Sequence, residues 1–193
     1  MPESFEVASS TVTLLRGDIT FEESDAIVNA ANGTLLGGSG VDGAIHRMAG
    51  PRLLEACKVI KSKLPNGTLA TGGAVITPGF GLRAKHVIHC VGPMYDIQHA
   101  DAPELLASCY REALRVAREH RLESVSFPSI STGVYRYPAE KAAPVALRTV
   151  RDSLLQFRQP ATVRFVLFDD RTLSAYLHAA RAVLRSPSVI PGA

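Results

Sequence analysis

Short runs of apolar and β-branched residues alternate along the chain with longer segments in which apolar residues recur every three or four positions. The short runs predict strands at about residues 11–15, 26–29, 74–77, 86–91, 124–127 and 163–168. The longer segments predict helices at about residues 42–49, 51–61, 103–120, 138–155 and 172–184. Helices between apolar strands must cover both faces of a sheet. The order therefore predicts an α/β fold, a three-layer α/β/α sandwich with a central mixed, mostly parallel sheet.

The length of 193 residues suits one domain with a complete core, and no internal repeat divides the sequence. We expect a single domain over residues 1–193, with its core at about residues 11–184 and frayed ends. Residues 186–193 contain two prolines and a glycine, a composition typical of a frayed terminus. In such folds a ligand binds beyond the carboxyl ends of the strands, so we expect the site in the loops that follow them.

The richest of these loops begins at Asn29 and Asn32 and continues into four glycines within seven residues, more than one tight turn requires. Glycine permits positive φ and leaves backbone N–H groups uncovered, so a phosphate or ribose can approach the next helix closely. Gly38 to Gly43 also matches GxGxxG, but residues 30–37 separate it from the strand and no acidic residue follows at the required distance. A nicotinamide-dependent oxidoreductase is therefore disfavoured, and a simple turn remains the alternative.

Asp42 stands in the first turn of the following helix, where a carboxylate complements the helix dipole. Because the dipole stabilises the charged form, we expect the pKa of Asp42 to be lowered. Such a carboxylate is a poor general base but a good acceptor for orienting a water molecule or a ribose hydroxyl. A catalytic role would then be one of positioning. We expect His46, one turn later, to pack or to form a hydrogen bond.

The second loop, residues 129–138, joins the strand at 124–127 to a helix opened by Pro138. Its small and hydroxylated residues around Gly133 can present consecutive N–H groups and hydroxyls to a diphosphate, although such a loop also serves as a plain connection. Two loops of this kind in one α/β chain favour a shared anionic ligand. Neither contains GxxxxGK[ST] or GxSxG, so a P-loop NTPase and a serine hydrolase are disfavoured.

Composition and charge exclude further classes. The formal charge is only +3 with scattered basic residues, so nucleic acid is not an expected partner. The three cysteines have no CxxC spacing, which fits a reducing compartment and no thiolate zinc site. His86 and Cys90 would face one side of a strand and His89 the other, so we expect no metal. Without an apolar leader or a long apolar stretch, we expect a cytoplasmic monomer with no membrane partner.

Four motifs in order resemble the macrodomain family: Gly17-Asp18-Ile19-Thr20, Asn29-Ala-Ala-Asn32, Gly40-Val-Asp-Gly-Ala-Ile-His46 and Ser131-Thr-Gly-Val-Tyr135. The most similar branch is the MacroD type, which includes the bacterial O-acetyl-ADP-ribose deacetylases. The resemblance runs from about Thr11 to the final helix. It implies ADP-ribose or its derivatives as ligand, mono-ADP-ribosylated proteins as substrates, and no cofactor.

The resemblance also implies a role for each matching residue. Asp42 and Asn32 would be catalytic and would hold the distal ribose and the attacking water. Asp18 would accept a hydrogen bond from the adenine amino group, with Ile19 beside it. Phe168 would stack near the adenine. The other ADP-ribose-binding positions are Asn29, Gly38, Gly40 and Val41 in the first loop, and Ser131, Thr132, Gly133, Val134 and Tyr135 around the diphosphate, with Tyr135 close to the distal ribose.

Two positions depart from the family pattern. Ser39 replaces a glycine in the first loop, and Arg136 replaces the glycine that follows the aromatic residue in the second. If residue 136 needs positive φ, its side chain costs about 1 kcal/mol. Alternatively, Arg136 reaches the phosphates or a modified partner protein. The shape of the second loop, and with it the substrate preference, stays open.

The leading hypothesis is an ADP-ribose-binding hydrolase. It would remove mono-ADP-ribose from acidic side chains of proteins, deacetylate O-acetyl-ADP-ribose, or do both, with a water positioned by Asp42 and the substrate's diphosphate helping to accept a proton. A non-catalytic ADP-ribose reader is the alternative. RNA binding is a third hypothesis, and only the modest excess of basic residues supports it. The physiological substrate and the target proteins are left open.

Overall fold

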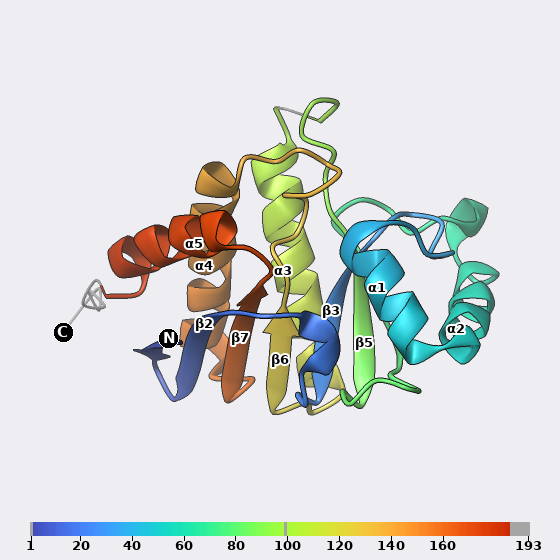
Figure 1. The fold of residues 1–193 in the computed structure, drawn as a ribbon, viewed down its shortest axis with the longest axis horizontal. Coiled ribbons are helices and arrows are strands. Elements are labelled where there is room, and N and C mark those ends of the chain that lie inside the picture. Colours follow the sequence, from blue (N-terminus) through green and yellow to red (C-terminus); the bar gives the residue numbers. More distant parts are fainter. Residues whose placement is uncertain (1, 99, 186–193) are drawn as a thin grey trace.

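The computed structural model describes residues 2–98 and 100–185 (Figure 1). The strands are β1 Glu3–Val7, β2 Ser10–Arg16, β3 Ala26–Ala31, β4 Ala74–Pro78, β5 His86–Val91, β6 Ser124–Phe127 and β7 Thr162–Leu167. The helices are α1 Gly40–Ala49, α2 Pro51–Lys61, α3 Ala102–Glu119, α4 Ala139–Phe157 and α5 Asp170–Val183, with two short 3₁₀ turns, η1 Ile19–Phe21 and η2 Pro65–Gly67. Every element expected from the sequence is present, with ends displaced by at most two residues. The segment 186–193, where fraying was expected, lies outside the described residues.

The seven strands form one sheet in the order β1-β2-β7-β6-β3-β5-β4. Neighbouring strands from β2 to β5 in this order run parallel, and β1 and β4 pair antiparallel at the two edges. The predicted α/β fold with a mixed, mostly parallel sheet is therefore confirmed. All the parallel strands end at the same edge of the sheet, and the loops after β3, β5 and β6 meet there.

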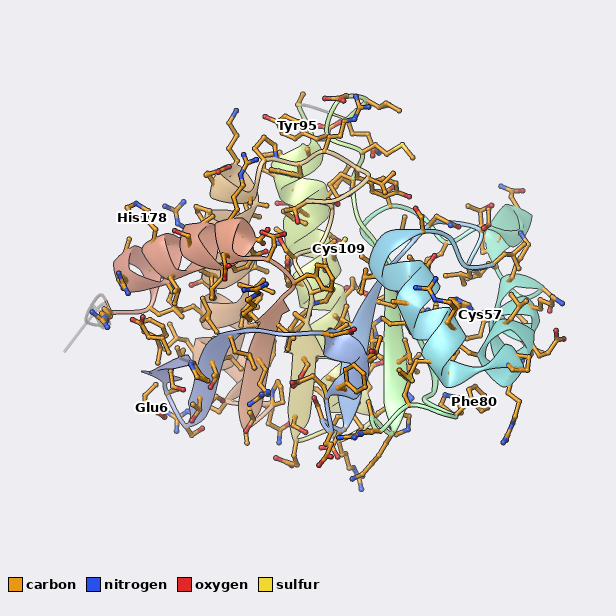
Figure 2. All side chains as sticks on the ribbon, viewed as in Figure 1. Glu6, Cys57, Phe80, Tyr95, Cys109 and His178 are labelled. Atoms are coloured by element: carbon orange, nitrogen blue, oxygen red, sulfur yellow. The ribbon has the colours of Figure 1, made fainter. Side chains whose placement is uncertain are left out.

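Side chains that alternate along each strand build two separate cores. In β3, Val28 packs in the larger core, beneath α3, α4 and α5, whereas its neighbour Ile27 packs in the smaller core, beneath α1 and α2. Cys57 of α2 and Cys109 of α3 belong to these two different cores (Figure 2). Helices thus lie on both faces, as the layer prediction requires. None of the helices in the described ranges is both long and apolar enough to span a bilayer.

The α1–α2 layer covers only part of its face, and several side chains of β1, β2, β6 and β7 on the rest of that face are polar. Ser4 of β1 and Thr13 of β2 share a hydrogen bond of 2.9 Å between their hydroxyls. Arg164 of β7 donates from Nε to Glu22 Oε2 at 2.6 Å, and Ser126 donates to the same oxygen at 2.7 Å. These pairs satisfy the polar groups without a helix above them.

The N-terminal residues, where fraying was expected, form the edge strand β1. Phe5 and Val7 point into the larger core and are 6% and 5% exposed. Glu3 extends from the same strand to the end of α5, where Arg181 Nη2 donates to it at 2.9 Å and Arg185 Nη2 at 2.8 Å. The charged residues Glu3 and Glu6 obscured the period of two in so short a strand.

A pair of substitutions in α2 tests the smaller core. Leu53 is fully buried, whereas Val59 of the same helix is 56% exposed. We expect Leu53→Ala to lower the free energy of unfolding by about 2–5 kcal/mol, because it removes buried methyl groups and leaves a cavity. The matched control Val59→Ala should change it by less than about 0.5 kcal/mol. Urea denaturation measures both, and similar losses in the two variants would contradict the assigned core.

Candidate functional site

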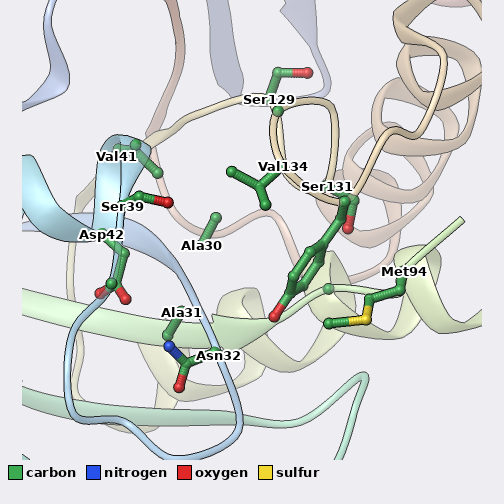
Figure 3. Close-up of a pocket in the computed structure, with 15 residues that line it drawn as sticks. Ala30, Ala31, Asn32, Ser39, Val41, Asp42, Met94, Ser129, Ser131 and Val134 are labelled. Atoms are coloured by element: carbon green, nitrogen blue, oxygen red, sulfur yellow. The ribbon is translucent and has the colours of Figure 1, made fainter.

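A cleft of about 390 Å³ lies at the carboxyl ends of β3, β5 and β6 and brings the two glycine-containing loops together (Figure 3). Asp42 and Ser39 lie on one side of it, and Ser131 and Met94 on the other. Its lining consists of Ala30, Ala31, Asn32, Gly38, Ser39, Gly40, Val41, Asp42, Gly92, Met94, Ser129, Ser131, Gly133, Val134 and Tyr135. Since no basic side chain is among these described residues, an anion bound here would meet N–H groups rather than a cation.

The first loop delivers the N-terminus of α1 to the cleft. A Cβ on Gly38 would lie 3.1 Å from Asp42 Oδ2 and 3.3 Å from Asn32 Nδ2, so glycine lets both polar groups approach the chain closely. The helix then starts at Gly40, with φ of +60°. N–H groups in the first turn of a helix have no acceptor within the helix, so this turn can donate hydrogen bonds to a bound anion. Ser39 has φ of −104°, and its departure from the family pattern therefore carries no backbone strain.

The second loop is held in a shape that exposes its amides. Ser131 has φ of 67°, and its hydroxyl is buried without a hydrogen-bond partner among the described residues. A Cβ on Gly92, at the end of β5, would collide with that hydroxyl, so the glycine permits the loop to lie against β5. Within the described chain, the N–H groups of residues 132–134 have no backbone acceptor. These N–H groups are available to a ligand in the cleft.

Two buried tyrosines support the second loop from below. Ser129 Oγ donates to the Tyr176 hydroxyl at 3.1 Å, and the hydroxyls of Tyr176 and Tyr110 lie 3.3 Å apart. Thr132 Oγ1 in turn donates to Ser129 Oγ at 2.8 Å. Both tyrosines are fully buried, and burial raises the pKa of each, so their hydroxyls stay neutral. The start of the loop is therefore fixed to α3 and α5.

Asp42 is buried, with 4% of its surface exposed, although it lines the cleft. Asn29 Nδ2 donates to Asp42 Oδ1 at 2.7 Å, and His46 Nε2 lies 3.5 Å from the same oxygen. Burial raises the pKa of Asp42, while the bond from Asn29 and the proximity of His46 act in the opposite direction. The expectation of a lowered pKa is therefore wrong, because withdrawal from water outweighs the helix dipole. Asp42 is a better proton acceptor than its place in the helix implied.

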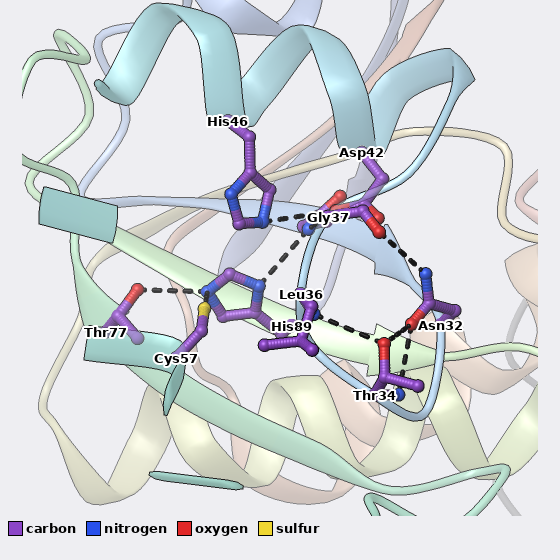
Figure 4. Close-up of polar contacts among 10 residues, drawn as sticks. Asn32, Thr34, Leu36, Gly37, Asp42, His46, Cys57, Thr77 and His89 are labelled. Carbon is purple, nitrogen blue, oxygen red and sulfur yellow. Dashed lines mark hydrogen bonds and ion pairs between the residues drawn. The ribbon is translucent and has the colours of Figure 1, made fainter. Parts of the chain in front are cut away.

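Asn32 is fixed by its own loop rather than by Asp42. Its Nδ2 donates to the Gly37 carbonyl at 2.9 Å, and its Oδ1 accepts from the Thr34 N–H at 3.0 Å (Figure 4). The side chain lines the cleft next to Gly38, so the two residues expected to be catalytic share one wall. Asn32 is therefore held in place before any ligand arrives.

A row of buried polar side chains continues behind Asp42. Asn29 Nδ2 lies 3.2 Å from His89 Nδ1, and His89 Nε2 lies 3.0 Å from Thr77 Oγ1 and 3.8 Å from Cys57 Sγ. Burial lowers the pKa of His89 to about 3, with the nearby His46 as a smaller cause. His89 is thus a neutral, hydrogen-bonded core residue. Among the described residues, no group of three or more His, Cys, Asp or Glu side chains is arranged to hold a metal ion.

Five of the expected binding residues lie outside the cleft lining. Asp18 Oδ1 accepts from the N–H and the hydroxyl of Thr20 at 2.9 and 2.7 Å, which caps η1. Ile19 is buried beside it, and Phe168 is 77% exposed at the end of β7. Asn29 is buried behind Asp42, and Thr132 turns its hydroxyl toward Ser129. The structure brings the remaining expected residues together.

Sequence reasoning missed several residues that line the cleft. Ala30 and Ala31 end β3 between the two asparagines, and Ser129 opens the second loop, so their neighbours in the motifs could have indicated them. Gly92 lies within the segment that resembles the family, but no role was assigned to it. Met94 gives no chemical signal in the sequence, because its place in the wall depends on how the segment after β5 approaches the second loop.

Arg136 adopts φ of 57°, the left-handed conformation that disfavours side chains other than glycine. Its guanidinium lies 3.6 Å from the Asp96 carboxylate, both side chains are largely exposed, and neither lines the cleft. We expect Arg136→Gly to be more stable than Arg136→Ala by about 1 kcal/mol, because only the former relieves the strain while both lose the ion pair. Thermal denaturation of the two variants checks this, and equal melting temperatures would contradict it.

The pKa of His89 predicts a pH dependence of stability. The ordinary pKa is 6.5, and the folded protein lowers it to about 3. Between these values the unfolded chain binds a proton that the native state does not, so unfolding becomes easier by about 1.4 kcal/mol for each pH unit of acidification. We expect His89→Gln to lack this part of the slope. Urea denaturation of both proteins from pH 7 to pH 4 measures it, and parallel curves would contradict the expectation.

The sequence and the structure are both similar to known proteins. The Macro domain family matches residues 28–146. An O-acetyl-ADP-ribose deacetylase of Salmonella gallinarum is 49% identical over 168 residues, which cover 87% of this chain and 93% of the relative. A solved Oceanobacillus iheyensis macrodomain with ADP has a TM-score of 0.91 and 45% identity, covering 94% of this chain and 96% of that one. A variant of that macrodomain with ADPR has a TM-score of 0.92 and 44% identity, covering 96% and 100%.

The family match spans both loops of the cleft, and the solved relatives extend the likeness over almost the whole chain. The resemblance stated from the four motifs is confirmed. This chain belongs to the Macro domain family.

Proposed function

We propose that this protein binds ADP-ribose and hydrolyses its esters, namely O-acetyl-ADP-ribose and mono-ADP-ribosylated acidic side chains of proteins. The observation that carries the proposal is the carboxylate of Asp42, which lines the cleft yet is 4% exposed, with a pKa raised by burial. A base with a raised pKa accepts a proton from water more readily near neutral pH. The relative named as an O-acetyl-ADP-ribose deacetylase, at 49% identity, supports the same reaction.

The geometry supports one orientation of the ligand. The diphosphate would accept hydrogen bonds from the first turn of α1 and from the N–H groups of residues 132–134. The distal ribose would lie between Asn32, Asp42 and Tyr135. Burial and then the nearby charge of Asp42 raise the pKa of Tyr135, so a neutral hydroxyl faces the carboxylate. The structures of relatives with ADP and ADPR support a ligand of this class.

The adenine would extend to Asp18 and Phe168, outside the cleft proper. Asp18 Oδ1 is occupied by its two bonds from Thr20, which leaves Oδ2 to accept from the adenine amino group. Phe168 presents an exposed ring at the end of β7, and a stacked base would cover apolar surface there. Ile19 fixes η1, and hence Asp18, by packing into the smaller core.

Both substrates contain an ester between a carboxylic acid and a ribose hydroxyl. Water held by Asp42 would add to the acyl carbon while Asp42 and the substrate's diphosphate take up its proton. Collapse of the tetrahedral intermediate breaks the bond between the acyl carbon and the ribose oxygen, which leaves with a proton. The products are ADP-ribose and either acetate or the restored acidic side chain.

Asp42→Asn keeps the size of the side chain but removes the base. We expect kcat for acetate release from O-acetyl-ADP-ribose to fall at least about 100-fold, while the Kd for ADP-ribose changes less than about tenfold. Asp152→Asn, an exposed position in α4, is the control and should match the wild type. A second assay with an automodified acceptor protein shows whether protein esters are also cleaved.

These assays separate hydrolysis from the alternative function. If Asp42→Asn turned over as fast as the wild type, Asp42 would not be the base. If calorimetry gave tight ADP-ribose binding and the wild type released neither acetate nor ADP-ribose, the protein would be a non-catalytic reader. Absence of ADP-ribose binding would overturn both functions.

A further inference from the structure

Three neighbouring strands place a polar residue on the face that α1 and α2 cover, directly behind Asp42. Asn29 of β3 lies opposite His89 of β5 in the parallel register, and Thr77 of β4 reaches His89 from the other side. All three side chains are at most 3% exposed. Their neighbours on the same face, such as Ile27 and Val87, are apolar core residues. Buried polar side chains in this layer call for an explanation. Each of them lacks contact with water and therefore depends on a hydrogen bond within the protein.

The contacts fix the direction of each hydrogen bond in the row. The Asn29 amide nitrogen contacts both Asp42 Oδ1, at 2.7 Å, and His89 Nδ1, at 3.2 Å. A carboxylate oxygen only accepts, so the Asn29 nitrogen is the donor, and its second hydrogen requires His89 Nδ1 to accept. The proton of the neutral ring is then on Nε2, where Thr77 Oγ1 accepts it at 3.0 Å. Cys57 Sγ, at 3.8 Å, is the weaker partner.

We propose that Thr77 and His89 are positioning residues of the hydrolase, which act on Asp42 through the amide of Asn29. The inference rests on the function proposed above. The bond to Thr77 Oγ1 stabilises the tautomer of His89 with its proton on Nε2. In this tautomer Nδ1 accepts from the Asn29 amide, and the amide nitrogen also donates to Asp42 Oδ1. Oδ2 is then left beside Gly38 at the cleft wall, where a water would bind.

The opposite arrangement shows why the distal hydroxyl matters. With the ring proton on Nδ1, His89 would donate toward Asn29, and the Asn29 amide would have to turn its oxygen to the position that contacts both His89 and Asp42. The amide oxygen and the carboxylate oxygen, both acceptors, would then repel each other. Asp42 would lose a well-directed donor at 2.7 Å. A misplacement of the carboxylate by a fraction of an ångström is enough to reduce the rate of a reaction that depends on an oriented water.

Substitution at Thr77 tests this at a distance from the ligand. Thr77→Val keeps the shape but removes the acceptor, so we expect kcat to fall roughly ten- to a hundredfold, with the Kd for ADP-ribose nearly unchanged. The acid limb of the kcat profile should move to higher pH, because the bond from Asn29 lowers the pKa of Asp42. Thr77→Ser should restore both. Ile76→Val, the adjacent residue on the other face of β4, is the control and should change neither.

The other groups that face Asp42 stay the same in these variants, which isolates the effect. They are His46 of α1, the Cys57 thiol of α2 and Tyr135 of the second loop. A Thr77→Val enzyme with the kcat and pH profile of the wild type would overturn the inference. So would failure of Thr77→Ser to restore a defect, since a purely structural loss need not respond to the hydroxyl.

A measurement without turnover separates this inference from the proposed function. Nitrogen NMR of the wild type should show His89 neutral at pH 7 with its proton on Nε2, and a proton on Nδ1 would overturn the row of bonds. Carboxyl-carbon NMR should show a higher pKa for Asp42 in Thr77→Val than in the wild type, and equal values would overturn the coupling. If the wild type hydrolysed neither ester, the proposed function would fail, and with it the catalytic sense of the inference.

Discussion

The cleft depends on one constraint, a carboxylate held almost out of water at the start of a helix. Asp42 is buried at the carboxyl edge of the sheet, where its charged form is disfavoured unless donors compensate for lost hydration. Asn29 supplies one such donor, and Gly38 lacks a side chain so that the chain can pass within van der Waals distance of Oδ2. The choice of residues around Asp42 thus follows from the requirement that a buried carboxylate has hydrogen-bond donors and enough space.

Recognition of an anion in this cleft would rely on backbone shape rather than on charge. No basic side chain is among its described lining residues, so the strength of binding would depend on how well N–H groups converge. That makes the conformation of the second loop decisive. Ser131 and Arg136 both hold positive φ, and two buried tyrosines fix the loop where it begins. The strain is retained because a relaxed loop would turn its amides elsewhere.

The sequence predicted the parallel core of the fold well, because the periods of strands and helices reflect burial on one face, and the glycines marked both loops. The sequence did not predict the features that depend on how deeply a residue is buried. The position of Asp42 in α1 was predictable, but its pKa was not, since a sequence displays the helix dipole and hides the desolvation that outweighs it. The charges of Glu3 and Glu6 concealed β1, and the contribution of Met94 to the cleft depends on packing between segments far apart in sequence.

His89 shows which signal was present and not used. Alternation along β5 assigns it to the face of Val87 and Val91, where an apolar residue belongs, and the same reasoning applies to Asn29 in β3. A single polar residue on such a face is commonly satisfied locally and says little. The strand order places β3 next to β5, with Asn29 opposite His89. The two polar residues are then informative together, because each can be the hydrogen-bond partner of the other. Sequence reasoning weighed His89 only against His86 and Cys90 of its own strand, whereas the sheet order relates it to Asp42, which it supports through Asn29.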